Sequence, residues 1–315
     1  MCWTAAWPPR SHPVCDPPPP APKTYHWGRV GPCLDHYAVM GNPIGHSLSP
    51  DIHAAFAQET DQPIRYTAEL VPLEGLTAAV TAFFGAGGKG LNVTLPFKQV
   101  AFRLCRRPSE RARVAGAVNT LWCSPDGVFH GDNTDGAGLV RDLIGNHDTR
   151  LAGLRVLVLG AGGAVRGVLG PILEERPAAV VCANRTLSNA LDLDRDFQGL
   201  ALVEVCDFSG LAGREFDVIV NGTSASLAGR LPPLPNGILR KGGCCYDLVY
   251  ARLPTPFVQW GVRQGASLAI DGLGMLVEQA AESFFLWRGV RPRTRPVIER
   301  LRDSIGQLSA ASIGT

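Results

Sequence analysis

The sequence predicts an α/β fold in two domains, and three observations support that prediction. The chain has 315 residues, enough for two domains with separate hydrophobic cores. Short apolar runs alternate with segments of helical pattern along most of its length, as they do in α/β proteins. One run, LRVLVL at 154–159, continues through a glycine turn into a predicted helix, the repeating unit of a parallel sheet with helices on both faces.

The glycine turn after 154–159 has the features of a nucleotide-binding unit. Gly160-Ala161-Gly162-Gly163 opens a predicted helix that continues to about Glu175. Glycines let the backbone approach a pyrophosphate closely, and the N–H groups and positive dipole of the helix N-terminus attract its charge. The third glycine of the G-x-G-x-x-G pattern would fall at Val165, so a tight turn without a ligand is the alternative.

The end of the next predicted strand indicates the cofactor. The apolar run at 178–182 leads to Asn184-Arg185-Thr186, where an NAD-binding unit would carry Asp or Glu for the ribose 2′-hydroxyl. A guanidinium flanked by hydrogen-bonding side chains suits a 2′-phosphate instead, because it can bind two phosphate oxygens and stack on adenine. The pattern favours NADP over NAD, and a solvated Arg185 in a loop is the alternative.

Composition and charge argue against several classes of protein. Hydrophobic residues make up 45% and charged residues 18% of the chain, which is ordinary for a soluble globular protein. The net charge of +2 favours neither a nucleic-acid nor a membrane partner, and no apolar run approaches the ~20 residues that span a bilayer. The first residues lack the pattern of a signal peptide. The nine cysteines, His46 and His53 lack metal-ligand spacing, so we expect no metal site and reduced thiols in a cytoplasmic protein.

Residues 1–35 differ in composition from the rest of the chain. They hold nine of the 25 prolines, including the run at 17–20, and show neither helical nor strand periodicity. We expect a disordered extension of polyproline II character. Binding to a proline-recognising partner is the alternative, and only the proline run favours it.

The stretch GNPIGHSLSP at 41–50 contains two neighbouring serines. Ser49 followed by Pro50 predicts a helix over 51–58, with the hydroxyl at the N-cap and proline at the first helical position. Ser47 and Ser49 would face the same side of an extended segment. Capping explains Ser49 alone, and two adjacent hydroxyls could hold a ligand carboxylate or polyol.

LNVTLPFK at 91–98 is predicted to be a strand end followed by a helix. Asn92 and Thr94 share one face of the strand, and Pro96 would start the helix, which puts Lys98 in its first turn. The helix dipole disfavours a cation there by ~0.3–1 kcal/mol, so stability alone would not select a lysine. Lys98 is therefore a candidate for proton transfer, and a lysine that reaches solvent is the alternative.

AGAVNTLW at 115–122 and the segment 127–130 predict a hairpin whose first strand carries Asn119. GDNTDG follows, before a predicted amphipathic helix at 139–144. Asp and Asn before a helix are typical N-caps, but two acids and an amide exceed what one cap needs. Asp135 would stand where the first domain meets the second, so it is a second candidate for the chemistry.

The remaining elements complete the two domains. Strands are expected at 37–40, 64–70, 202–205, 217–220, 244–248 and 268–269, and helices at 73–84, 273–287 and 297–307. In the second half of the chain this alternation predicts that the parallel sheet continues beyond the glycine turn.

Seven motifs of this sequence occur in the same order in one known family. They are GNPIGHSLSP at 41–50, LNVTLPFK at 91–98, AGAVNT at 115–120, GDNTDG at 131–136, GAGGA at 160–164, ANRT at 183–186 and DGLGMLVEQA at 271–280. On these motifs the chain resembles the shikimate dehydrogenase family over about residues 36–310. The resemblance implies reduction of 3-dehydroshikimate to shikimate, in aromatic amino-acid biosynthesis, by hydride from C4 of NADPH.

The resemblance also implies roles for individual residues. Lys98 matches the catalytic lysine, and Ser47 and Ser49 match serines that bind the substrate carboxylate. Residues that match positions around the substrate are Asn92, Thr94, Asn119, Asp135 and Gln279 near its hydroxyls and Tyr250 near its carboxylate. Residues that match cofactor positions are Gly160, Ala161, Gly162, Gly163 and Ala164 in the pyrophosphate loop, Asn184, Arg185 and Thr186 in the adenosine-phosphate clamp, and Leu248 and Gly272 beside the nicotinamide.

Hydride delivery to a ketone builds negative charge on the carbonyl oxygen, which needs a proton donor within hydrogen-bond reach. We expect Lys98 and Asp135 to form this acid–base pair. The ammonium of Lys98 would donate the proton, while Asp135 would orient the amine and bind a substrate hydroxyl.

The family resemblance implies a discontinuous substrate-binding domain, 36–135 completed by about 272–315, around a Rossmann NADP-binding domain at 136–271. It also implies that the last helix packs on the first domain. We expect a monomer or homodimer. Two positions depart from the family pattern. Asn189 replaces a frequent basic residue, which would weaken the 2′-phosphate clamp, and Leu248 replaces a common Met, an apolar exchange that we expect to be tolerated.

Two alternatives remain. A quinate/shikimate dehydrogenase that uses NAD is disfavoured by Asn184-Arg185-Thr186 and by the pair Ser47 and Ser49, which resembles the shikimate-selective members. A non-catalytic NADP-binding sensor of the same fold is disfavoured by Lys98 and Asp135, because a sensor needs no proton donor.

Overall fold

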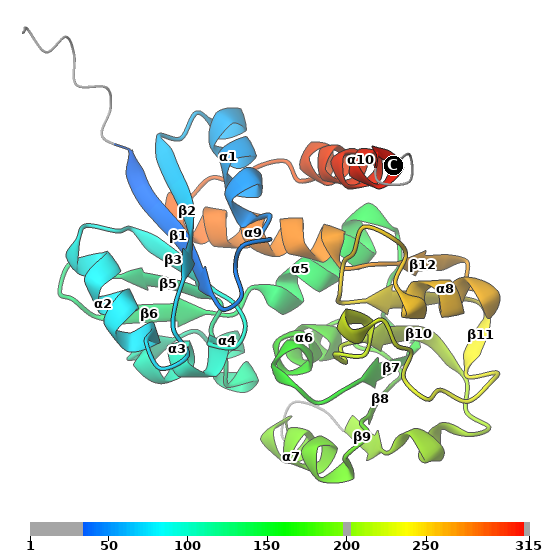
Figure 1. Ribbon diagram of the computed structural model, residues 1–315. Coiled ribbons are helices and arrows are strands. Elements are labelled where there is room, and N and C mark those ends of the chain that lie inside the picture. Colours follow the sequence, from blue (N-terminus) through cyan, green and yellow to red (C-terminus); the bar gives the residue numbers. More distant parts are fainter. Residues whose placement is uncertain (1–33, 198–202, 312–315) are drawn as a thin grey trace, which may run out of the picture. The chain divides into compact units, whose positions relative to one another are not determined.

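The computed structural model describes residues 34–197 and 203–311. Two six-stranded sheets with their helices make up this part of the chain (Figure 1). The predicted α/β class is therefore confirmed. Residues 1–33 of the expected extension, and Leu202 of an expected strand, lie outside the described residues. The first strand begins at Asp35.

The first sheet is mixed, with strand order β2-β1-β3-β5-β6-β4. Its strands are β1 (Asp35–Gly41), β2 (Ile64–Leu70), β3 (Gly90–Val93), β4 (Arg107–Pro108), β5 (Thr120–Cys123) and β6 (Phe129–Asp132). β1 is parallel to β2 and β3, and the predicted hairpin of β5 and β6 continues the sheet in antiparallel order. The register sets Asn92 opposite Thr120 and Thr120 opposite Asp132, so polar residues form a row across three strands.

Successive side chains of β1 point to opposite faces of the first sheet, and different helices cover the two faces. Ala38 and Met40 pack in a core with α2 (Leu76–Gly85), α3 (Lys98–Leu104) and α4 (Glu110–Ala115). The opposite face carries Tyr37, whose ring contacts Trp287, and it is covered by α1 (Ser49–Thr60).

The second sheet is entirely parallel, with strand order β12-β11-β10-β7-β8-β9. Its strands are β7 (Arg155–Leu159), β8 (Ala179–Ala183), β9 (Val203–Cys206), β10 (Phe216–Asn221), β11 (Leu239–Asp247) and β12 (Leu268–Ile270). Val156 and Val158 of β7 pack in one core cluster, and Leu157 and Leu159 pack in another, so both faces of the strand are buried as predicted. This is the strand order of a doubly wound dinucleotide-binding sheet: from β7, the chain adds β8 and β9 on one side and then β10, β11 and β12 on the other.

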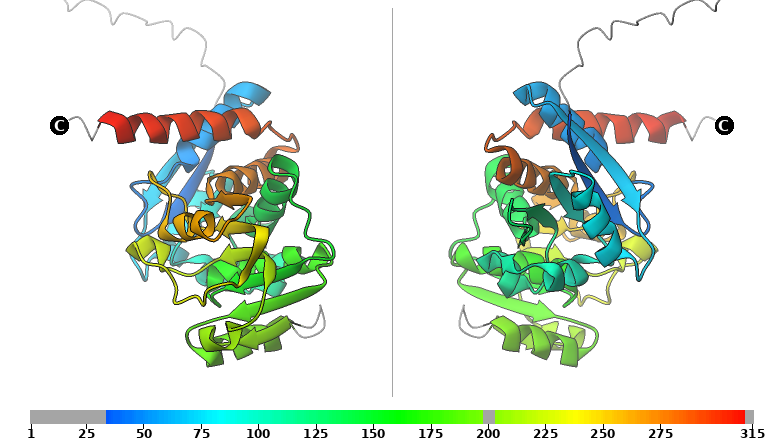
Figure 2. Two further views of the ribbon diagram at one scale, coloured as in Figure 1. Left: turned by 90° about the vertical axis from the view of Figure 1, so that its right-hand side faces the viewer. Right: turned by 90° about the vertical axis from the view of Figure 1, so that its left-hand side faces the viewer.

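The helices of the second half are α5 (Asp135–Arg141), which continues into a π-helical turn at Asp142–Asn146, α6 (Gly163–Glu174), α7 (Leu187–Phe197), α8 (Pro256–Arg263), α9 (Leu273–Arg288) and α10 (Arg295–Ala311). The 3-10 turns lie at Phe208–Leu211 and Ser226–Ala228. As the family resemblance implies, the last two helices return to the first sheet, since Phe284 and Leu301 share a core cluster with Ile52 and Phe56 of α1 (Figure 2). The domain boundaries themselves stay a prediction.

Three local expectations were wrong. Ser49 is the first residue of α1 rather than its N-cap: Leu48 holds that position in a helical conformation, and no side chain caps the helix. Pro96 precedes α3, which starts at Lys98 after a turn. The helix expected from 139 starts at Asp135 instead, because the backbone N–H of Asp135 donates to the side chain of Asn133 and the chain can turn there.

Glycines allow unusually close contact between α5 and α9. A β-carbon on Gly138 would lie 2.7 Å from the Gln279 β-carbon, and one on Gly274 would lie 2.1 Å from Oδ1 of Asp142. Both positions exclude any larger residue unless the helices separate. The helix that carries Asp135 is thereby held against the helix that carries Gln279.

We expect Gly274→Ala to destabilise the protein by roughly 1–3 kcal/mol, because the added methyl group collides with a buried carboxylate. Gly306→Ala in α10 is the matched control: nothing lies within 4 Å of its added methyl group. Ala should slightly stabilise that helix. Denaturant unfolding of both variants measures the difference, and equal midpoints would contradict the close contact.

Candidate functional site

Lys98 and Asp135 meet in the structure. Each is the first residue of its helix, and Nζ of Lys98 donates to Oδ2 of Asp135 at 2.5 Å. The lysine side chain is 22% exposed and the aspartate side chain 7%. Because an ammonium has three N–H donors, Lys98 keeps donors for a further partner on its exposed side.

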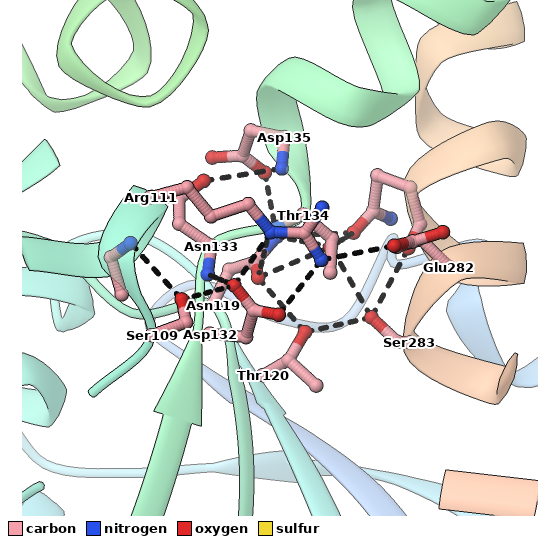
Figure 3. Close-up of polar contacts among 12 residues, drawn as sticks. Ser109, Arg111, Asn119, Thr120, Asp132, Asn133, Thr134, Asp135, Glu282 and Ser283 are labelled. Atoms are coloured by element: carbon pink, nitrogen blue, oxygen red, sulfur yellow. Dashed lines mark hydrogen bonds and ion pairs between the residues drawn. The ribbon is translucent and has the colours of Figure 1, made fainter. Parts of the chain in front are cut away.

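Asp135 has a partner on each carboxylate oxygen. Oδ2 accepts from Lys98. Oδ1 accepts from Nδ2 of Asn119 at 2.8 Å (Figure 3). The backbone N–H of Asp135 donates to Oδ1 of Asn133 at 3.1 Å. The orientation of the carboxylate, and with it the aim of the Lys98 ammonium, is therefore fixed by the protein.

Asn119 connects this pair to α9. Its Nδ2 also lies 2.9 Å from Oγ1 of Thr134 and 3.3 Å from Oε1 of Gln279. Its Oδ1 accepts from the backbone N–H of Thr134 at 2.9 Å and from the hydroxyl of Thr120 at 2.9 Å. Three predicted site residues, Asn119, Asp135 and Gln279, thus belong to one hydrogen-bonded network.

Asn92 belongs to the same network. Its Nδ2 donates to the backbone oxygen of Asn119, to Thr120 and to Ser283 at 3.0–3.2 Å, and its Oδ1 accepts from the hydroxyl of Tyr66 at 2.7 Å. Both ends of the buried Asn92 amide are therefore occupied by protein groups. Ser283 also lies 2.7 Å from Oγ1 of Thr120.

The remaining predicted substrate residues lie at three further places. Oγ of Ser47 accepts from the backbone N–H of Ser49 at 3.3 Å, so the two serines are adjacent although the segment is a turn rather than extended. Thr94 follows β3, next to Gly41. Tyr250 packs against the core cluster that α1 shares with α9 and α10, and burial raises its pKa.

An ion cluster supports the turn before Asp135. Arg111 binds both oxygens of Asp132 at 2.7 Å and reaches Glu282 at 3.0 Å, and Glu282 also pairs with Arg141 and Arg291. Oδ1 of Asp132 accepts from the backbone N–H of Asn133 as well. Burial alone would raise the pKa of Glu282, but its arginine partners outweigh this and lower the pKa to about 2.

Several of these network residues were not predicted from the sequence: Tyr66, Thr120, Ser283, Arg111 and Glu282. Ser283 lies four residues after Gln279, so helical spacing puts it on the same side of α9. That spacing was the signal available for Ser283. Tyr66 had no such signal, since it lies in an ordinary strand.

The glycine turn has the shape that a pyrophosphate needs. Gly160 has φ = +106°, which favours glycine, and it lies against the backbone of Gly222. Gly162 is the N-cap of α6 without a capping side chain, and nothing lies within 4 Å of a β-carbon on Gly162 or Gly163. Uncapped N–H groups beside open space fit the phosphates of a dinucleotide.

The other predicted cofactor residues lie after β8 and β11. Nδ2 of Asn184 donates to the backbone oxygen of Thr186 at 2.8 Å, which shapes the turn, and the side chains of Arg185 and Asn189 are exposed. A β-carbon on Gly272 would lie 2.4 Å from the backbone oxygen of Leu248, so the structure brings Leu248 and Gly272 together.

Within residues 34–197 and 203–311, no group of three or more His, Cys, Asp or Glu side chains could hold a metal ion. No helix of that part is long and apolar enough to cross a membrane. The six cysteines described form no disulfide, and burial raises the thiol pKa of Cys105 and Cys244 to about 12.

Three family models match the chain. They describe the shikimate dehydrogenase substrate binding domain at residues 39–121, shikimate/quinate 5-dehydrogenase at 142–228 and the shikimate 5′-dehydrogenase C-terminal domain at 272–302. The shikimate dehydrogenase (NADP(+)) of Methylococcus capsulatus is 58% identical over 267 residues, which cover 85% of this chain and 96% of that protein. The chain belongs to the shikimate dehydrogenase family.

Other relatives and solved structures agree with this family membership. The shikimate dehydrogenase (NADP(+)) of Alkalilimnicola ehrlichii is 58% identical over 85% of this chain and 98% of that protein. The shikimate 5-dehydrogenase of Thermus thermophilus, solved in complex with NADP(H) and shikimate, superposes with a TM-score of 0.77 at 33% identity, covering 86% and 99% of the two chains. An Ael1 enzyme from Pseudomonas putida gives 0.79 at 47% identity, covering 85% and 98%.

The ion cluster predicts a pH dependence of stability. A carboxyl whose pKa is lowered on folding stabilises the protein above its ordinary pKa of 4.5, and this contribution is lost as the pH falls from about 4.5 towards 2. Wild type should therefore lose more stability over this range than Glu282→Gln.

At pH 7 we expect Glu282→Gln to be less stable by roughly 1–3 kcal/mol, because three partly exposed guanidinium groups lose a charged hydrogen-bond partner. Glu110→Gln, at an exposed ion pair with Arg113, should match wild type. Urea unfolding at pH 7 and pH 3 measures both effects. Parallel pH profiles for wild type and Glu282→Gln would show that the cluster does not hold the pKa of Glu282 down.

Proposed function

We propose that this chain is an NADP-dependent shikimate dehydrogenase that reversibly reduces 3-dehydroshikimate to shikimate in aromatic amino-acid biosynthesis. The observation that carries the proposal is the contact of Lys98 with Asp135, in which Asn119 fixes the carboxylate from the other side. An oriented ammonium can supply the proton that ketone reduction requires. The curated relatives bear the name shikimate dehydrogenase (NADP(+)), which agrees with this chemistry.

In this mechanism, bound NADPH supplies hydride to the substrate carbonyl carbon. The ammonium of Lys98 donates a proton to the oxygen that becomes negative, and in the reverse direction its neutral amine accepts the proton of the hydroxyl. Asp135 holds the amine in place and is available to a neighbouring substrate hydroxyl. The other proposed substrate residues are Ser47, Ser49 and Tyr250 for the carboxylate, and Asn92, Thr94, Asn119 and Gln279 for the hydroxyls.

The proposed cofactor residues follow the geometry of the second sheet. The N–H groups at Gly160 to Ala164 would hold the pyrophosphate, Asn184 to Thr186 the 2′-phosphate, and Leu248 and Gly272 the nicotinamide. Both β7 and β8 end at the carboxyl edge of the sheet, where dinucleotides bind doubly wound folds. A cytoplasmic monomer or homodimer without nucleic-acid or membrane partners belongs to the same proposal, and the cysteine thiols agree with a reducing compartment.

Initial rates of shikimate oxidation by the purified chain with NADP test the proposal, beside quinate and beside NAD. Turnover with shikimate and NADP well above the other pairs supports it. Comparable rates with quinate or NAD would favour the broader quinate/shikimate dehydrogenase, and binding of NADP without turnover would favour a sensor.

We expect Lys98→Ala to lower kcat roughly 10²–10⁴-fold with little change in KM for shikimate, because proton transfer contributes only in the transition state. Lys89→Ala, an exposed lysine before β3, is the control and should keep wild-type kinetics. Steady-state kinetics measure both variants. A large rise in KM at normal kcat would make Lys98 a binding residue instead.

We expect Arg185→Ala to raise KM for NADP about tenfold or more, since a charge-assisted hydrogen bond is worth about 1.5–3 kcal/mol. KM for NAD, which lacks the 2′-phosphate, should change little. Arg195→Ala in α7, an exposed residue paired with Asp192, is the control. Equal rises of KM for NADP and NAD would contradict a phosphate clamp at Arg185.

A further inference from the structure

Asp271 directly follows β12, at the point where the chain enters α9. Its side chain is only 6% exposed, and its Oδ1 accepts from the backbone N–H of Leu273 at 3.2 Å. The turn closed by this bond carries Gly272, which lies against the backbone oxygen of Leu248. Leu248 and Gly272 are the proposed nicotinamide residues. The Asp271 carboxylate therefore shapes the backbone on which one of them lies.

The carboxylate of Asp271 is in turn bound from α10. Arg302 donates through Nη1 to Oδ2 at 2.9 Å and through Nη2 to Oδ1 at 2.5 Å. A guanidinium that binds both oxygens fixes the plane of a carboxylate as well as its position. Because an unpaired buried charge costs free energy, the carboxylate depends on this partner to stay inside the loop.

A second contact also holds the first turn of α9. The hydroxyl of the buried Tyr246 accepts from the backbone N–H of Met275 at 3.2 Å and donates to Oδ2 of Asp142 at 2.6 Å. First-turn N–H groups have no partner within their own helix, so side chains supply acceptors for two of them here. The start of α9 is thus held at Met275 by β11 and at Leu273 by Asp271, whose carboxylate is fixed from α10.

Helix α10 connects this loop to the first sheet. It lies beside α9 (Figure 1). Leu301, which precedes Arg302 in sequence, packs in the core with Ile52 and Phe56 of α1. α1 begins at Ser49, a proposed substrate residue. One helix therefore contacts the element that begins at a proposed substrate residue and, through Arg302, the loop that carries a proposed nicotinamide residue.

We propose that Arg302 is a positioning residue for the nicotinamide half of the cofactor: it holds the Asp271 carboxylate, which keeps Gly272 against Leu248. This inference rests on the proposed function and adds a residue of α10 to it. Arg302 acts through Asp271 and takes no part in proton or hydride transfer. Its loss loosens the loop, so C4 of the nicotinamide is less well aligned with the reacting carbon of the substrate. The adenosine half of NADP is held elsewhere, at Asn184 to Thr186.

The test is Arg302→Met, which keeps much of the side-chain stem and removes the guanidinium. The Arg302 side chain is 48% exposed, so the exchange opens no core cavity. Misalignment of the nicotinamide predicts a fall of about three- to tenfold in the rate of hydride transfer, measured as NADPH formation in a single turnover with shikimate. An unchanged rate would overturn the inference.

The inhibitor adenosine 2′,5′-bisphosphate reports on the other half of the cofactor, because it has the adenosine and 2′-phosphate of NADP but no nicotinamide. Its inhibition constant in Arg302→Met should stay within about twofold of wild type. Arg185→Ala should show the reverse pattern, since the proposed phosphate clamp binds this inhibitor as well. If Arg302→Met weakens the inhibitor as much as it slows hydride transfer, Arg302 does not act on the nicotinamide half.

Arg295→Met is the matched control, because it makes the same exchange in the same helix. Arg295 is exposed and pairs at 3.8 Å with Glu299, also of α10. This variant should keep the wild-type rate of hydride transfer. Melting curves of both variants separate stability from alignment. A lower melting temperature of Arg302→Met at an unchanged rate would make Arg302 a structural residue only.

A double-mutant cycle with Asp271→Asn tests whether Arg302 acts through Asp271. In that background, Arg302→Met should slow hydride transfer by less than about a further twofold, because the effects of residues in contact are not additive. Full multiplication of the two effects would overturn the inference. If Asp271→Asn does not fold, the comparison of hydride transfer with inhibitor binding in Arg302→Met decides.

The outcomes for the function and for Arg302 are separate. If wild type oxidises shikimate with NADP and Arg302→Met transfers hydride at the wild-type rate, the positioning role is overturned and the function stands. If wild type forms no NADPH from shikimate and NADP, the proposed function fails and the positioning role fails with it.

Discussion

A carboxylate with both oxygens bound is the interaction on which the candidate site depends. Asn119 donates a hydrogen bond to one carboxylate oxygen of Asp135, and Lys98 donates to the other. The backbone N–H of Asp135 donates to the side chain of Asn133. A buried carboxylate with an unsatisfied oxygen would cost free energy, so these partners contribute to stability as well as to geometry. The first residue of α5 is thus fixed before any ligand binds.

Helix α9 links this carboxylate to the rest of the molecule. Gln279 and Ser283 contact the hydrogen-bond network, and Glu282 between them in sequence carries the ion cluster with Arg111. Another side of the same helix contributes Phe284 to the core beneath α1. One helix therefore connects the polar site, the ion cluster and an apolar core, and Gly138 and Gly274 let it lie close to the segment that begins with α5.

Local pattern predicted much of this architecture and part of the site. The apolar run of β7 and its glycine turn follow from burial on both faces and from backbone freedom, which a sequence records directly. The N-cap at Ser49 was wrong: Leu48 holds that position in a helical conformation, and its side chain packs against the core beneath α1. Tyr66 could not be predicted, since it reaches Asn92 across β1, and no local spacing encodes a contact between strands that are not neighbours. The roles of the site residues stay a proposal.

The contact between α5 and α6 ties two stretches of sequence into one unit. A methyl group on Gly167, one turn into α6, would lie 3.1 Å from Oδ2 of Asp135, and one on Gly136 would lie 2.4 Å from Pro171. The helix that follows the glycine turn and the segment that carries Asp135 therefore pack so closely that neither leaves room for an added methyl group at these glycines. A chimaera with a relative keeps this contact unchanged when the segments 131–138 and 160–171 come from the same parent.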